Sequence, residues 1–273
     1  MNTRRRILPE GWYPGSETQV KRTLASWTPE DGPRRGVSCI VPHAGWFFSG
    51  KLAYRTIWRL RPDADTVIVV GGHLPSSGNM LAAEEEGYET PLGIIRADLA
   101  LRAELEKEMP LDSDDDPDNT VEVVLPMVAC AFPNARALWL RAPQSMVAAG
   151  AGRVIREAAE KTGRRVVVIG SSDLTHYGIG YGFTPRGTGA EALSWARDEN
   201  DAGIIDAFLN MDDEKILYYA VQRKAACSAG GALAAAAFAR GEGLEKGTLV
   251  GYLNSADVHE SDSFVGYAGV VYE

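Results

Sequence analysis

The chain has 273 residues, enough to bury a large core, and carries a formal net charge of −9. This acidic balance favours solubility and argues against a broad nucleic-acid-binding surface, so we expect no nucleic-acid partner. The three arginines at 4–6 lead into proline and glycine instead of an apolar signal core, and the alanine-rich run 225–239 is too short to span a bilayer. We therefore expect no membrane partner. Three cysteines fit reduced thiols in the cytoplasm better than a disulfide framework.

Apolar, β-branched runs alternate with helical patterns along much of the chain. The pattern predicts strands at 37–41, 66–70 and 166–169, and helices at about 50–60 and 153–161. Such alternation favours an α/β fold, a three-layer sandwich with a mostly parallel central sheet. Two further strands are predicted at 248–253 and 264–272, and an antiparallel arrangement is expected for them. Because no linker interrupts the sequence, 1–273 is expected to form a single domain.

Five aspartates crowd the segment 112–118. A calcium-binding loop would place its ligands at fixed positions, and that spacing is missing here. We therefore interpret the segment as a solvated loop.

Three of the four histidines follow predicted strands. His43 comes after the first strand, His73 after the second and His176 after the third. In an open parallel sheet, functional groups gather at the carboxyl ends of the strands, so these imidazoles are expected to share one site. A lone histidine is more often structural. Three at matching strand ends favour a shared metal, because neutral imidazole is the commonest protein ligand.

Cys227 is the natural fourth member of this site. It lies at the predicted start of an alanine-rich helix, where a helix N-terminus lowers the pKa of a thiol and favours the metal-binding thiolate. Burial as a small hydrophobic residue is the equally weighted alternative. Cys39 and Cys130 lie in apolar runs and are interpreted as core. Asp173 precedes His176 by three residues and is expected to orient an imidazole, hold a proton or cap the local turn.

Several motifs occur in the order seen in one known family. They are Gly-Trp-Tyr-Pro at 11–14, Pro-His-Ala-Gly-Trp-Phe-Phe-Ser-Gly at 42–50, Gly-His at 72–73, Glu-Thr-Pro-Leu-Gly at 89–93, Ser-Ser-Asp-Leu-Thr-His-Tyr-Gly at 171–178, Cys227, Asn-Ser-Ala-Asp at 254–257 and Val-Gly-Tyr-Ala at 265–268. With these motifs the sequence resembles the Memo family, also named AmmeMemoRadiSam system protein B, over nearly its whole length. Several ordered motifs in one chain are a far more specific signal than any one alone.

The resemblance implies a fold related to that of class III extradiol dioxygenases, which are non-haem iron enzymes. It implies that His43, His73 and Cys227 are metal ligands, with Asp173 and His176 beside them as catalytic residues. Family members are described as binding iron or copper, so iron(II) is the expected cofactor, with copper or zinc as alternatives. The resemblance brings no settled substrate, and the small-molecule substrate stays unknown.

Two positions depart from the family pattern. The chain has Asp118, Asn119 and Thr120 where the family usually has Glu-His-Ser, and an amide cannot transfer protons as imidazole does. Ser228 stands where a glycine often follows the family cysteine, a change expected to alter the approach to the thiolate.

Three classes of function fit these residues. The first is an oxygen-dependent oxidoreductase of dioxygenase type, in which a thiolate replaces the usual carboxylate ligand and His176 acts as acid and base. The second is a metal-binding or adaptor protein without turnover, acting on a protein partner. The third is a hydrolase in which zinc activates water. A serine triad of Ser172, Asp173 and His176 is disfavoured because three residues so close in sequence cannot easily reach the required geometry. The aromatic residues 46–48 are expected to pack under the following helix rather than line a pocket.

Overall fold

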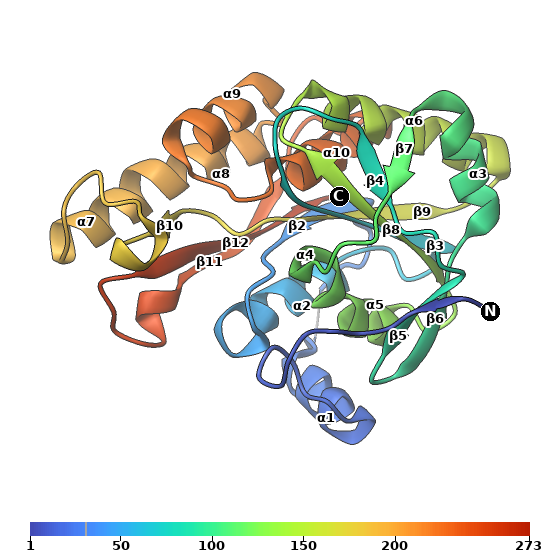
Figure 1. The fold of residues 1–273 in the computed structure, drawn as a ribbon, viewed down its shortest axis with the longest axis horizontal. Helices are drawn as coiled ribbons and strands as arrows, with labels where there is room; N and C mark the ends of the chain where they lie inside the picture. The colour runs from blue at the N-terminus through green and yellow to red at the C-terminus, as the bar shows by residue number, and fades with distance from the viewer. Residues whose placement is uncertain (31) are drawn as a thin grey trace.

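A nine-stranded sheet lies at the centre of the computed structural model, which describes residues 1–30 and 32–273 (Figure 1). Its middle consists of four parallel strands in the order β2 (Ser38–Val41), β9 (Val166–Ser171), β3 (Thr66–Leu74) and β8 (Arg136–Pro143). The first three of these confirm the predicted strands, with β2 beginning one residue later than expected. β8 is an addition to the prediction.

Antiparallel strands extend the sheet on both sides. β12 (Phe264–Tyr272) pairs with β2, and it also pairs with β11 (Thr248–Asn254) and the short β10 (His176–Tyr177). On the other side β4 (Met80–Ala82) pairs antiparallel with β8 and parallel with β7 (Leu111–Ser113). The antiparallel arrangement expected for the last two strands is confirmed. A separate small sheet joins β1 (Thr3–Arg4), β5 (Gly87–Thr90) and β6 (Gly93–Arg96).

Helices cover both faces of the large sheet, which gives the predicted three layers (Figure 1). Successive strand side chains point to opposite faces, so Ile68 and Val70 of β3 belong to one core and Val67 and Val69 to the other. The first core is closed by α3 (Leu99–Glu108), α6 (Met146–Thr162), α8 (Ala202–Leu209), α9 (Asp213–Leu217) and α10 (Ala229–Gly241). The second is closed by α1 (Glu17–Trp27), α2 (Lys51–Trp58) and α5 (Leu125–Ala131).

The ends of the predicted helices have local causes. The helix predicted at 153–161 lies inside α6, which stops because Gly163 takes a left-handed conformation (φ 65°) at its C-cap. The helix predicted at 50–60 is α2, preceded by a π-helical turn at Trp46–Gly50. Within the described part of the chain, no helix is both long and apolar enough to cross a membrane.

The interpretation of 112–118 as a solvated loop is wrong for two of its aspartates. Asp114 and Asp118 are buried beside Arg141 of β8, whose Nη2 lies 2.6 Å from Asp114 Oδ1 and whose Nη1 lies 3.5 Å from Asp118 Oδ2. A buried guanidinium requires carboxylate partners, and the acidic segment supplies them. Asp116, by contrast, is exposed and reaches the same arginine from the surface.

Candidate metal centre

Three strand ends and one helix start converge at one edge of the sheet. His43 follows β2, His73 lies in the last residues of β3, and Asp173 and His176 follow β9. Cys227 was predicted to lie at the start of the alanine-rich helix. In the structure it precedes that helix, α10, by two residues. The structure brings all five predicted site residues together, because the strands are parallel and their carboxyl ends share one edge.

Two glycines allow the start of α10 to lie directly on the strand ends. A Cβ at Gly231 would stand 2.3 Å from Val70 O, and one at Gly72 would stand 2.5 Å from Ser228 Oγ. Any side chain at either position would push the helix away from the sheet. These close approaches bring Cys227 to the histidines.

The side chains of His43, His73 and Cys227 form a cluster that could hold a metal ion. Each offers one ligand atom, and these atoms all lie within 4.8 Å of one another. Cys227 Sγ is 3.2 Å from His43 Nε2, and the two imidazole rings meet edge to face with centroids 5.0 Å apart. Two imidazoles and a thiolate are ligands that suit iron, copper and zinc.

His43 is fixed from two sides. It is fully buried, its backbone N–H donates to Asp173 Oδ1 at 2.7 Å, and its Nδ1 lies 3.0 Å from Ser171 Oγ. With Nδ1 engaged by the serine, Nε2 is the nitrogen turned toward Cys227.

His73 is the exposed member of the cluster and has an unusual backbone. Its φ is +59°, a region that residues other than glycine rarely adopt, and such strain recurs at functional sites. His73 Nδ1 lies 3.6 Å from Asp118 Oδ2, and Asp118 in turn accepts the Thr120 backbone N–H at 2.8 Å. The carboxylate predicted as part of a solvated loop therefore backs a candidate ligand.

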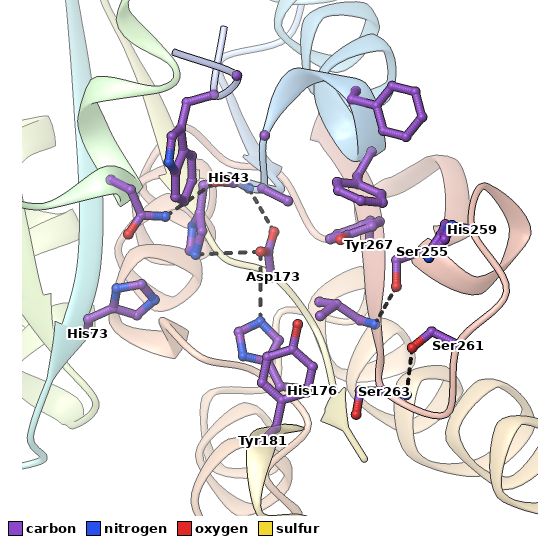
Figure 2. Close-up of a pocket in the computed structure, with 18 of the residues that line it drawn as sticks. His43, His73, Asp173, His176, Tyr181, Ser255, His259, Ser261, Ser263 and Tyr267 are labelled. Carbon is purple, nitrogen blue, oxygen red and sulfur yellow. Dashed lines mark hydrogen bonds and ion pairs between the residues drawn. The ribbon is translucent and has the colours of Figure 1, made fainter. Parts of the chain in front are cut away.

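Asp173 joins the cluster to His176 (Figure 2). Its buried Oδ2 lies 3.8 Å from His43 Nε2 and 3.8 Å from His176 Nε2. The His176 ring is one-third exposed and packs beside Tyr181, with ring centroids 5.0 Å apart. His176 is therefore linked to His43 through the shared Asp173 carboxylate, which lies between the two rings.

The charges of these groups reinforce one another. Burial alone would raise the pKa of the Cys227 thiol, but His43 and His73 hold it well below its usual value. Burial lowers the pKa of His73, but Asp118 and Cys227 together raise it to about 10. The pKa of His43 is also raised, because Asp173 and Cys227 outweigh the effect of its burial. The metal-free site therefore favours a thiolate, the form that binds metals.

The pKa values of Asp173 and His176 move in opposite directions. Burial would raise the pKa of Asp173, but His43 and His176 lower it. Burial would lower the pKa of His176, but Asp173 and Cys227 raise it. Both shifts favour the charged forms, an ionised Asp173 carboxylate and a protonated His176 ring.

A pocket of about 500 Å³ opens beside the cluster. Figure 2 shows His43, His73, Asp173 and His176 at one end, with Tyr267 and the 255–263 segment further along its wall. Its lining also includes Phe47 and Phe48. The expectation that residues 46–48 pack under the following helix is confirmed for the buried Trp46 and wrong for the exposed Phe47, whereas Phe48 both lines the pocket and packs against the cluster that contains Leu52 of α2. The lining residues of 255–263 and Tyr181 were missed by the sequence analysis, because polar loops carry no periodic signal.

Ser172 does not form a serine triad. Its hydroxyl donates to Asp173 O at 2.9 Å and accepts the Ser228 backbone N–H at 3.3 Å. The hydroxyl therefore braces the backbone around the site, and the absence of a triad agrees with the short sequence spacing to His176. Cys39 is confirmed as a core residue, and Cys130 is half-buried against the same core.

Comparison with known proteins identifies the family. Residues 6–271 match the sequence profile of the Memo-like protein family. The chain belongs to this family. It is 30% identical over 281 residues to a MEMO1 family protein of Thermococcus onnurineus, with 96% of each chain covered. It is 31% identical over 279 residues to one of Pyrococcus abyssi, covering 95% of this chain and 96% of that one.

The fold of this Memo family protein also resembles a solved structure. The crystal structure of an uncharacterized protein from Escherichia coli K12 aligns with a TM-score of 0.56, covering 88% of this chain and 100% of that chain. The sequence identity is 14%, so the likeness concerns the fold alone. It supports the predicted α/β class with a mostly parallel sheet between helices.

Proposed function

We propose that this Memo family protein is an oxygen-dependent oxidoreductase with iron(II) held by His43, His73 and Cys227. The observation that carries the proposal is the cluster of two imidazoles and one thiolate beside a pocket large enough for a small-molecule substrate. Two histidines and one anionic ligand form the donor set of many non-haem iron oxygenases. When bound, iron would supply the reaction with oxygen that amino-acid side chains cannot perform.

The residues present fit such an ion. The depressed pKa of Cys227 favours the thiolate, and His43 already turns Nε2 toward it. His73 is backed by Asp118 through Nδ1, which leaves Nε2 available.

We assign proton transfer to His176. Its ring lines the pocket and its raised pKa keeps it protonated closer to neutral pH. Asp173 stabilises the protonated ring and limits its orientation. His176 is therefore placed to give a proton to a substrate bound in the pocket, or to take one from it.

The first experiment measures metal content and oxygen uptake. Protein purified without oxygen should contain about one iron per chain, and its Fe(II) form should consume oxygen faster than the Cys227→Ser variant. Cys130→Ser is the matched control, because Cys130 is also half-buried but lies outside the cluster. Peptide mass spectrometry should find Cys227 oxidised before Cys39 and Cys130.

Other outcomes would point to other functions. Equal oxygen uptake in wild type and Cys227→Ser, with Cys227 still reduced, contradicts the oxidoreductase proposal. One zinc per chain together with hydrolytic turnover would favour the hydrolase, in which zinc activates water. A bound metal without turnover of any substrate would favour a binding role toward a protein partner.

A further inference from the structure

A buried group of polar side chains lies behind the candidate metal centre. Asn200 and Asp201 end a π-helix, η3 (Ala196–Asp201), and both are fully buried. Asp201 Oδ1 accepts the backbone N–H of Thr175 at 3.1 Å as well as its hydroxyl, and Tyr252 donates to Asp201 Oδ2 at 2.8 Å. Because Thr175 directly precedes His176, these bonds tie the His176 loop to the end of η3.

Asn200 connects the same group to the segment that carries Cys227. Its Nδ2 donates to Thr175 Oγ1 at 2.9 Å and to Arg223 O at 3.0 Å, and Arg223 Nε donates back to Asn200 Oδ1 at 3.2 Å. Arg223 lies four residues before Cys227 in the chain. One asparagine therefore bonds to both of the segments that bring His176 and Cys227 to the site.

The two segments also touch each other directly. The Cys227 backbone N–H donates to Asp173 O at 3.2 Å, so a movement of the 173–176 loop reaches Cys227. Gly266 closes the other side: it exchanges backbone bonds with Leu174 and Thr175, and a Cβ there would stand 2.0 Å from Asp201 Oδ2. The carboxylate therefore packs closely against the backbone of Gly266, which is itself bonded to the loop.

Burying a carboxylate and an amide in a core costs desolvation free energy, which hydrogen bonds must offset. In the described part of the chain, the polar side-chain atoms of Asn200 and Asp201 form hydrogen bonds with Thr175, Arg223 and Tyr252. Both Thr175 and Arg223 belong to segments that carry site residues. π-helical turns are frequent at functional sites, which agrees with this placement.

We propose that Asn200 and Asp201 are positioning residues that hold His176 and Cys227 in a fixed relation to each other. They touch neither the candidate ligands nor the pocket, and act through Thr175 and Arg223. The inference rests on the metal centre of the proposed function and adds the residues that hold His176 and Cys227 in place around that centre.

The test compares Asn200→Ala and Asp201→Ala with wild type, using Co²⁺ as the probe. Both variants should bind Co²⁺ about 10- to 100-fold more weakly in competition with a chelator, and their Co²⁺ visible spectrum should change. Asp201→Asn should restore the wild-type affinity and spectrum. The amide keeps an oxygen for Thr175 and can donate to the Tyr252 hydroxyl.

Asp98→Ala is the matched control for lost stability. Asp98 is also buried and accepts from a threonine hydroxyl, Thr66 Oγ1 at 2.6 Å, and from the Leu101 backbone N–H at 3.2 Å. Thr66 begins β3, whereas His73 lies near the end of that strand, so this group is far from the site. The control should lower the melting temperature yet keep the Co²⁺ affinity and spectrum.

A second measurement does not depend on a metal. In metal-free protein, alkylation of Cys227 by iodoacetamide at about pH 9, where even an ordinary thiol is largely ionised, reports access to the sulfur. Asn200→Ala and Asp201→Ala should react several-fold faster than wild type and Asp98→Ala. If wild type binds no Co²⁺ at the cluster, the proposed metal centre fails, and this comparison still decides the positioning role. Unchanged alkylation in both variants, or equal changes in Asp98→Ala, would overturn it.

Discussion

Replacing Asp118 by asparagine tests how His73 is prepared for a metal. Asp118 Oδ2 faces His73 Nδ1 at 3.6 Å, and the same carboxylate accepts the Thr120 backbone N–H and lies 3.5 Å from Arg141 Nη1. A carboxylate in this position keeps the imidazole proton on Nδ1 and leaves the lone pair of Nε2 for the metal. We expect Asp118→Asn to fold and to bind metal more weakly.

The size of the effect follows from the donors around the new amide. The amide oxygen can still accept from Thr120, which turns the amide NH₂ toward His73 and Arg141. His73 Nδ1 must then act as an acceptor, so the imidazole proton moves to Nε2, the nitrogen that a metal needs. Loss of such a partner typically weakens metal binding about 10- to 100-fold, or about 1.4–2.8 kcal/mol.

The assay is a chelator competition with Zn²⁺ on wild type, Asp118→Asn and Asp116→Asn. Asp116 is the matched control because it also pairs with Arg141, at 3.2 Å, but is 75% exposed, whereas the ion-pair partner of His73 is Asp118. The control should keep the wild-type affinity. Equal affinity in all three proteins, or an equal loss in both variants, would refute the tautomer argument.

Three further predictions concern the same part of the molecule. His43→Ala, His73→Ala and Cys227→Ser should each lose most of the metal, measured as metal per folded chain, because each removes one of three ligands. His176→Ala should keep the metal and lose turnover, since a carboxylate separates His176 from the cluster. For Asp201, burial outweighs its hydrogen bonds and raises the pKa of the carboxyl to about 6, so protonation favours the folded state. The stability of wild type relative to Asp201→Asn should therefore fall by about 2 kcal/mol as the pH rises from about 4 to about 6, measured by urea unfolding.

Most of the sheet could be predicted because its strands are buried on both faces. The run at 66–70 is continuous and β-branched, and such a sequence has few alternatives to a central parallel strand. Once three such strands were placed, the histidines after them had to share an edge. The convergence of His43, His73 and His176 was therefore predictable from topology, without knowledge of any side-chain contact.

The supporting residues around the site were not predictable in the same way. Asp118 lies in an acidic segment whose composition favours solvent, and its burial depends on Arg141 of β8, more than twenty residues further along the chain. Asn200 and Asp201 sit on a helix with no motif to mark them, and their partners belong to two other segments. Tertiary hydrogen bonds of this kind leave no periodic trace, so only the folded chain reveals them.

The two departures from the family pattern have different consequences in this fold. Asn119 lines the pocket, but its Nδ2 donates to His43 O at 3.3 Å, so the amide supports the backbone of a candidate ligand. Because an amide moves no proton, the proposed acid and base role is assigned to His176 and not to Asn119. Ser228 has a φ of −139°, which needs no glycine, and its hydroxyl lies 3.8 Å from Cys227 Sγ. The backbone at position 228 therefore accepts residues other than glycine, and the serine hydroxyl adds a polar neighbour to the Cys227 sulfur.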